Sequence, residues 1–107
     1  MTQQEISIDE MQGAVSEAAE LLKIMSHQER LLVLCQLTQG EVGVGELQKV
    51  SSLTQSAFSQ HLTVLRKHGI IRARKESQQV FYSLADKKAE SLITCLHSIF
   101  CSDRKER

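Results

Sequence analysis

Residues 53–69, LTQSAFSQHLTVLRKHG, form the stretch that decides the fold. Its apolar residues recur at the three- and four-residue spacing that places side chains on one face of a helix. This inner stripe consists of Phe58, Leu62 and Leu65. Thr54 is a favoured helix N-cap, and Gly69 suits the left-handed position that ends a helix. The stretch therefore predicts a single helix that runs from Thr54 to His68.

The other face of this helix carries hydroxyl and amide side chains and no acidic residue. Glutamine can form paired hydrogen bonds to adenine, and serine is small enough to approach bases or phosphates. We therefore interpret this face as a recognition surface for the major groove of DNA, rather than as an ordinary solvated face. The candidate contacts are Gln55, Ser56, Ser59, Gln60, His61, Thr63 and Arg66. The role of His61 stays open, because its position beside Leu62 and Leu65 would also suit packing against the core.

Charge is distributed unevenly along a chain whose formal net charge is zero. Residues 1–46 hold eight acids and two bases, whereas residues 47–75 hold six bases and no acid. Residues 76–107 carry five of each. A basic stretch in a neutral protein predicts a surface that faces a polyanion, and the alternative is a solvated face. With three Phe, one Tyr and no Trp, the chain is not suited to stacking the bases of single strands.

The segment before the recognition helix predicts three further helices. Residues 1–8 show no periodicity and are expected to form a disordered tail. A first helix is predicted by an apolar stripe at Met11, Val15, Ala18, Leu22 and Met25. Ser26 and Glu29 fit a capping box, so a second, central helix is expected from His27 to about Thr38. After a glycine-containing loop, a short helix at about 46–51 would pair with the recognition helix as a helix-turn-helix.

Residues 70–75 and 79–84 change to an extended pattern and predict two strands joined by a turn at 76–78. This hairpin carries Arg72, Arg74, Lys75 and Gln78. As a wing it would lie along phosphates or in the minor groove. Alternatively, its charges would protect an edge strand from aggregation. Asp86 is expected to cap a last helix that ends near Cys101, followed by a charged tail over 102–107.

This order predicts a mainly α fold with a two-stranded hairpin, a winged helix-turn-helix of order α-α-α-α-β-β-α over residues 9–101. No apolar run approaches a membrane span and no signal peptide is visible, so a cytoplasmic protein is expected. No catalytic triad or phosphate-binding loop is present, so we expect neither an enzyme nor a cofactor. The alternative is an interaction module that uses the helix-turn-helix for protein contact, which a steep salt dependence of duplex binding would exclude.

Five segments together resemble the ArsR/SmtB family of bacterial transcriptional repressors. They are residues 21–34 (LLKIMSHQERLLVL), 44–47 (VGEL), 53–66 (LTQSAFSQHLTVLR), 69–71 (GII) and 81–84 (FYSL). The resemblance covers about residues 14–101. It implies a homodimer built from the first and last helices, and a palindromic double-stranded DNA operator read at two major-groove half-sites.

The two usual metal sites of this family look absent from the sequence. The family often places a Cys-x-Cys pair before the recognition helix, but residues 45–49 contain no cysteine. Other members bind metal on the last helix through Asp and His, but here Asp86 is followed by Lys87 and Lys88. No metal is therefore expected at either place.

The three cysteines, Cys35, Cys95 and Cys101, are too few for a secreted disulfide scaffold. Cys95 and Cys101 would be about 9 Å apart along the axis of one helix, which is too far for a disulfide. Any link within the chain must therefore involve Cys35, with Cys101 or Cys95 as its partner. A helix end gives Cys101 the greater freedom.

Cysteines at 35 and 101 resemble the sulfide- and persulfide-responsive branch of the family, typified by SqrR, BigR, YgaV and HlyU. The resemblance implies that Cys35 and Cys101 become linked by reactive sulfur species or oxidants and that this link changes DNA affinity. Cys95 has no counterpart in that scheme. Two alternatives remain: Cys35 is a small buried hydrophobe, or Cys35, His97 and Cys101 bind zinc or copper in a metal-responsive repressor.

Overall fold

The stretch that decides the fold is helical over Gln55–Lys67, labelled α4. At its start the Thr54 hydroxyl accepts a hydrogen bond from the Ala57 N–H at 3.2 Å. Just beyond its end Gly69 adopts a φ of 74°, which is the left-handed conformation that glycine tolerates at no steric cost. The predicted N-cap and the predicted terminating glycine are both confirmed.

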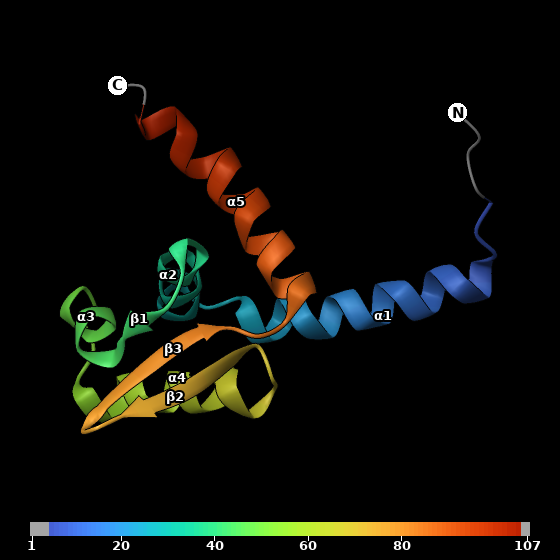
Figure 1. Cartoon of the computed structure of the whole chain (residues 1–107). Helices are drawn as coiled ribbons and strands as arrows, with labels where there is room; N and C mark the ends of the chain where they lie inside the picture. The colour runs from blue at the N-terminus through green and yellow to red at the C-terminus, as the bar shows by residue number, and fades with distance from the viewer. Residues whose placement is uncertain (1–4, 106–107) are drawn as a thin grey trace.

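The structure is a computed structural model that describes residues 5–105, with side chains through Cys101. Around α4 it places, in chain order, α1 (Ile8–Met25), α2 (Gln28–Gln36), the 3-10 turn η1 (Leu37–Gln39), β1 (Val42–Gly43), α3 (Val44–Lys49), β2 (Ile71–Glu76), β3 (Gln79–Leu84) and α5 (Lys87–Lys105). Helices α2, α3 and α4 gather around the sheet to form a head, and α1 and α5 lead away from it in different directions (Figure 1). Within residues 5–105, no helix combines the length and the hydropathy needed to cross a membrane.

The sheet has one strand more than the sequence predicts. Strands β2 and β3 form the expected antiparallel hairpin, from Ile71 opposite Leu84 to Glu76 opposite Gln79. The two-residue strand β1 adds to the other edge of β3, which gives the order β1-β3-β2. A strand of two residues is too short to show an alternating pattern, so its segment was expected to be loop. The winged helix-turn-helix is confirmed, and its two-stranded hairpin is corrected to a three-stranded sheet.

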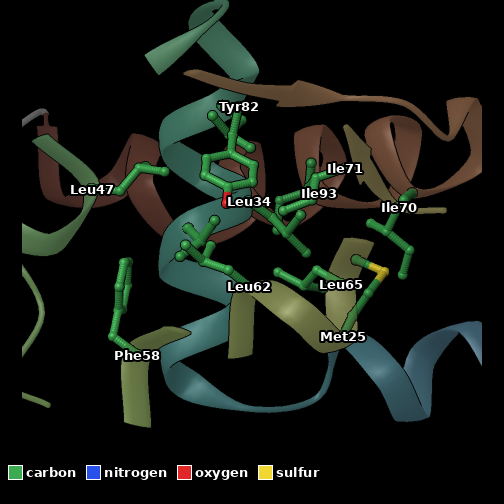
Figure 2. Close-up of a cluster of buried hydrophobic side chains, with 13 residues drawn as sticks. Met25, Leu34, Leu47, Phe58, Leu62, Leu65, Ile70, Ile71, Tyr82 and Ile93 are labelled. Carbon is green, nitrogen blue, oxygen red and sulfur yellow. The ribbon is translucent and has the colours of Figure 1, made fainter. Parts of the chain in front are cut away.

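The hydrophobic core lies where α2, α4, α5 and the sheet meet (Figure 2). The whole inner stripe of α4 is buried, as predicted, and α2 contributes Val33 and Leu34. Helix α2 is therefore central, although Leu32 on its other side is 37% exposed. The buried set is Met25, Val33, Leu34, Leu37, Leu47, Phe58, Leu62, Leu65, Ile70, Ile71, Tyr82, Ala89 and Ile93.

Helix α1 begins earlier than predicted. The Ser7 hydroxyl accepts a hydrogen bond from the Glu10 N–H, and the Glu10 carboxylate accepts one from the Ser7 N–H, both at 3.1 Å. This capping box starts the helix at Ile8, inside the segment expected to be a tail. The apolar stripe could not reveal it, because a capping box depends on two polar residues. The rest of that expectation, for residues 1–4, lies outside the described residues.

The boundaries around the helix-turn-helix also shift by a few residues. The N-cap of α2 is His27 rather than Ser26, because the His27 ring Nδ1 accepts the hydrogen bond from the Glu29 N–H at 3.1 Å. Helix α2 ends at Gln36, and Thr38 belongs to η1. Helix α3 spans 44–49 instead of about 46–51.

Asp86 caps α5 as predicted, since its Oδ1 accepts a hydrogen bond from the Ala89 N–H at 3.0 Å. The helix continues to Lys105 instead of ending near Cys101. No glycine or proline follows Cys101 to stop it, so a charged segment extends the helix. Residues 106 and 107 of the expected tail lie outside the described part of the chain.

Candidate functional site

The outer face of α4 presents the predicted recognition residues to solvent. Six of the seven candidates have exposed side chains: Gln55, Ser56, Ser59, Gln60, Thr63 and Arg66. The helix contains no acid, and its basic residues lie in the last turn. A face without carboxylates can approach a phosphate backbone without charge repulsion, while its amides reach the base edges.

His61 lies apart from this outer face. Its half-buried ring accepts a hydrogen bond at Nδ1 from Arg30 Nε at 3.1 Å, and its centroid is 4.1 Å from that of His27. Burial lowers the pKa of His61, and the charges of His27 and Arg30 lower it further. The position of His61 therefore fits the packing alternative, in which the ring joins α4 to the start of α2.

The turn between α3 and α4 is also attached to α2. The Glu29 carboxylate accepts hydrogen bonds from the Ser51 hydroxyl at 2.9 Å and from the Ser52 hydroxyl at 3.2 Å. Ser51 in turn accepts a hydrogen bond from the Leu53 N–H at 3.1 Å. Sequence reasoning assigned Glu29 to a capping box and missed this contact, because its partners are 22 and 23 residues away.

The wing divides its basic residues between two faces. Side chains alternate along a strand, so Arg72 and Arg74 share one face of β2, and Phe81 lies opposite Arg74. Lys75 lies on the other face, together with the core residue Tyr82. The four wing candidates, Arg72, Arg74, Lys75 and Gln78, are all exposed.

Arg74 is engaged by two carboxylates. Its guanidinium donates to Glu41 at 2.8 and 2.9 Å and to Glu76 at 2.7 Å, and it lies 4.8 Å from the centre of the Phe81 ring. These hydrogen bonds raise the pKa of Arg74, and the hydrogen bonding of Glu41 to Arg74 lowers the pKa of Glu41. Arg74 thus ties β2 to the segment before β1. Among the residues that the structure describes, Arg72 and Lys75 have no ion-pair partner, so they carry the free charge of the wing.

Helices α2 and α5 line an open pocket of about 260 Å³, and both sensing candidates are among its lining residues. Its lining residues are Leu31, Cys35, Ile93, Leu96, His97, Phe100 and Cys101. Cys35 and Cys101 are half-buried free thiols, whereas Cys95 is exposed and lies outside this lining. The structure therefore brings Cys35 to the same pocket as Cys101 and not to Cys95.

The environment of Cys35 disfavours its thiolate. Burial raises the pKa of the Cys35 thiol, and the neighbouring Cys101 sulfur raises it further. Two thiolates that share one pocket repel each other, and an apolar lining solvates neither of them. Cys35 therefore forms its thiolate less readily than an unburied cysteine would, so it is not suited to make the first attack on an oxidant.

The metal alternative receives one observation in its favour. His97 lines the pocket beside Cys35 and Cys101, so the three proposed ligands share one surface. Within the described residues, however, no three His, Cys, Asp or Glu side chains are arranged to hold a metal ion.

Comparison with known proteins identifies similar sequences and folds. The family model described as bacterial regulatory protein, arsR family, matches residues 27–73. The biofilm growth-associated repressor of Xylella fastidiosa is 39% identical over 98% of this chain and 92% of that protein. The transcriptional activator HlyU of Vibrio cholerae is 42% identical over 90% of this chain and 89% of that protein. The crystal structure of the transcriptional repressor BigR from Xylella fastidiosa superposes with a TM-score of 0.80 at 41% identity, covering 90% of this chain and 98% of that one.

The different surroundings of the cysteines predict different reactivities. At about pH 8, iodoacetamide is expected to alkylate Cys95 faster than Cys35, because Cys95 is exposed and burial raises the pKa of Cys35. The substitution Cys101→Ser should accelerate alkylation of Cys35, since it removes one cause of that raised pKa. Time-resolved peptide mass spectrometry measures both rates. Equal rates at Cys35 and Cys95 in the native protein would contradict the assigned environments.

Proposed function

Since the chain belongs to the ArsR family of bacterial regulatory proteins, in the branch of BigR and HlyU, we propose that it is a regulator whose DNA affinity is set by two thiols. It is a DNA-binding transcriptional regulator, as its relatives are, and those relatives are not enzymes. In the proposed function a homodimer binds a palindromic operator. Linking Cys35 to Cys101 by reactive sulfur species or oxidants changes its affinity for that operator.

The proposed DNA contacts combine α4 and the wing. The exposed amides and hydroxyls of α4 would read base edges in the major groove, and Arg66 would contact phosphate. Arg72, Lys75 and Gln78 would contact the backbone or the minor groove beside it. Arg74 is paired with Glu41 and Glu76, so it supports the wing rather than supplying a free charge.

The apolar faces of α1 and α5 support a homodimer. On α1, Ile8 is 67% and Val15 is 60% exposed, and on α5 Phe100 is 63% exposed. A 107-residue chain gains by covering such surfaces with a second copy. A two-fold dimer places its two α4 helices symmetrically, which is why the proposed operator is palindromic.

One observation carries the thiol proposal: Cys35 from α2 and Cys101 from α5 line the same apolar pocket. These residues are 66 positions apart in the sequence, so a bond between them would join the head to the last helix. The pocket is apolar, and its volume of about 260 Å³ leaves space for added sulfur atoms.

A persulfide, RSSH, is the only oxidant needed to link Cys35 to Cys101. Because the pKa of Cys35 is raised, we assign the first attack to Cys101. The Cys101 thiolate takes the outer sulfur of RSSH and releases the thiol RSH. Cys35 then attacks the sulfur of Cys101, forming the disulfide and releasing hydrogen sulfide. Each additional RSSH inserts one more sulfur atom into the link and releases one more RSH.

The link would reach the DNA-binding surface through α2. Cys35 lies on the same short helix as Arg30, which holds α4 through His61, and as Glu29, which holds the turn before α4. A link that pulls α2 toward α5 therefore shifts the two recognition helices of a dimer relative to each other. Coupling of about 1–3 kcal/mol is typical of such linked sites.

The recognition surface is tested by Gln60→Ala. We expect the variant to bind a duplex, selected from a randomised pool by the native protein, about tenfold more weakly, because a paired amide–adenine contact is worth about 1–3 kcal/mol. The matched control is Gln39→Ala, which removes an exposed glutamine outside α4 and the wing. Fluorescence anisotropy at several salt concentrations measures both. Native binding without salt dependence, or an unchanged affinity for Gln60→Ala, would exclude this surface.

The thiol switch is tested by Cys35→Ser. The variant is expected to bind the same duplex as the reduced native protein does, and to keep it after treatment with glutathione persulfide, which releases the native protein. Cys95→Ser is the matched control and should release DNA normally. Release of DNA by the persulfide-treated Cys35→Ser variant would show that the pair is not the switch. Release only upon addition of zinc or copper(I) would favour the metal alternative.

A further inference from the structure

Two histidines meet where α4 packs on the start of α2. The ring of His61 on α4 lies 4.1 Å from that of His27, the N-cap residue of α2, with the two planes tilted by 44°. Arg30 reaches both neighbouring helices, because its Nε donates to His61 Nδ1 at 3.1 Å and its Nη1 donates to the Ile24 carbonyl of α1 at 2.8 Å. This His27–Arg30–His61 cluster contains a direct side-chain hydrogen bond between α2 and the recognition helix.

The hydrogen bonds fix the protonation of both rings. Arg30 Nε–H and the Glu29 backbone N–H are donors, so His61 Nδ1 and His27 Nδ1 must each accept through a lone pair. Both rings are therefore neutral and carry their proton on Nε2. A second proton would occupy Nδ1 and turn each acceptor into a donor that faces another donor.

Protonation is opposed by charge as well as by geometry. The charges that act on His61 come from His27, Arg30 and Glu29, all at the start of α2. Arg30 and a protonated His27 repel a protonated His61, and only Glu29 favours it. Glu29 is already shared by Ser51 and Ser52 in the turn before α4.

We propose that this cluster positions the recognition helix and makes operator binding sensitive to acid. Protonation of His61 breaks its hydrogen bond with Arg30. This loss loosens the contact that orients α4, so operator affinity falls as the pH falls. The proposal rests on the assignment of α4 as the DNA-reading helix and is independent of the thiols.

The pH range follows from the sign of the shift. The pKa of His61 lies below the ordinary value for histidine, about 6.5, so the folded protein favours the neutral ring. The stabilisation by His61 is complete above that ordinary value and is lost as the pH falls through the lowered pKa. The expected change therefore lies on the acid side of neutrality.

The same helix contains a built-in control. His68, the C-cap residue of α4, is exposed, and its Nδ1 is 3.0 Å from the Val64 carbonyl oxygen. A carbonyl only accepts hydrogen bonds, so His68 Nδ1 is the donor, unlike the acceptor Nδ1 of His61. His68 therefore serves as the control histidine of α4.

The test is operator affinity as a function of pH, measured by anisotropy with a pH-insensitive fluorophore on the selected duplex. Between about pH 8 and about pH 5.5 at constant ionic strength, native affinity is expected to fall about threefold to tenfold, since one pKa unit of coupling corresponds to about tenfold. His61→Asn keeps an acceptor for Arg30 that does not titrate, so its affinity should vary much less with pH. His68→Asn should retain the native pH dependence. Far-UV circular dichroism restricts the comparison to pH values at which each protein is folded.

Each outcome decides the matter. A native affinity that does not change with pH, or a His61→Asn variant that titrates like the native protein, overturns the proposal. If His61→Asn does not fold, His61→Gln replaces it, because its amide oxygen can also accept a hydrogen bond from Arg30 and does not titrate, and an undiminished pH dependence overturns the proposal. Loss of affinity in Gln60→Ala at about pH 8 shows that α4 reads DNA, so a flat native profile then contradicts only the histidine cluster.

Discussion

The nine-residue helix α2 is the constraint on which the rest of the structure depends. Its inner side is buried in the core, and three of its other residues contact or face neighbouring elements. Glu29 holds the turn before α4, Arg30 holds α4 itself through His61, and Cys35 faces α5 across the apolar pocket. We expect a helix this short to move as a rigid body, so that a displacement at one of these contacts also displaces the others. The proposed thiol link and the proposed response to acid would both act on DNA binding through it.

Charge explains how a neutral chain presents a DNA-binding surface. The basic residues of the segment 47–75 lie on α3, α4 and β2, and the structure pairs two of them with carboxylates: Lys49 with Glu46, and Arg74 with Glu41 and Glu76. Arg66, Arg72 and Lys75 stay exposed on the elements proposed to face DNA. Two carboxylates, those of Glu41 and Glu76, therefore hold the wing through Arg74, while the remaining cations would supply the proposed attraction for phosphate.

Much of the fold could be predicted from the sequence, because strong local signals encode it. The inner stripe of α4, Thr54, Gly69 and Asp86 each marked an element that the structure contains. Strand β1 was missed because it is two residues long, and the early start of α1 was missed because the apolar stripe begins only at Met11, although the capping box of Ser7 and Glu10 can be read from the sequence. The site was predicted less completely. The His61–Arg30 and Arg74–Glu41 contacts join residues 31 and 33 positions apart, and periodicity carries no information about such pairs.

The most direct measurement is the mass of the reduced native protein and of its proteolytic peptides after treatment with glutathione persulfide, with hydrogen peroxide as the comparison. The predicted product is a single cross-linked peptide pair that contains Cys35 and Cys101, directly or with added sulfur atoms, while Cys95 stays unlinked. A link formed by persulfide and not by peroxide would identify a sensor of sulfur species, and a link formed by either would identify a general thiol switch. A link through Cys95, or loss of DNA binding with no link at all, would contradict the proposal that a bond between Cys35 on α2 and Cys101 on α5 is the switch.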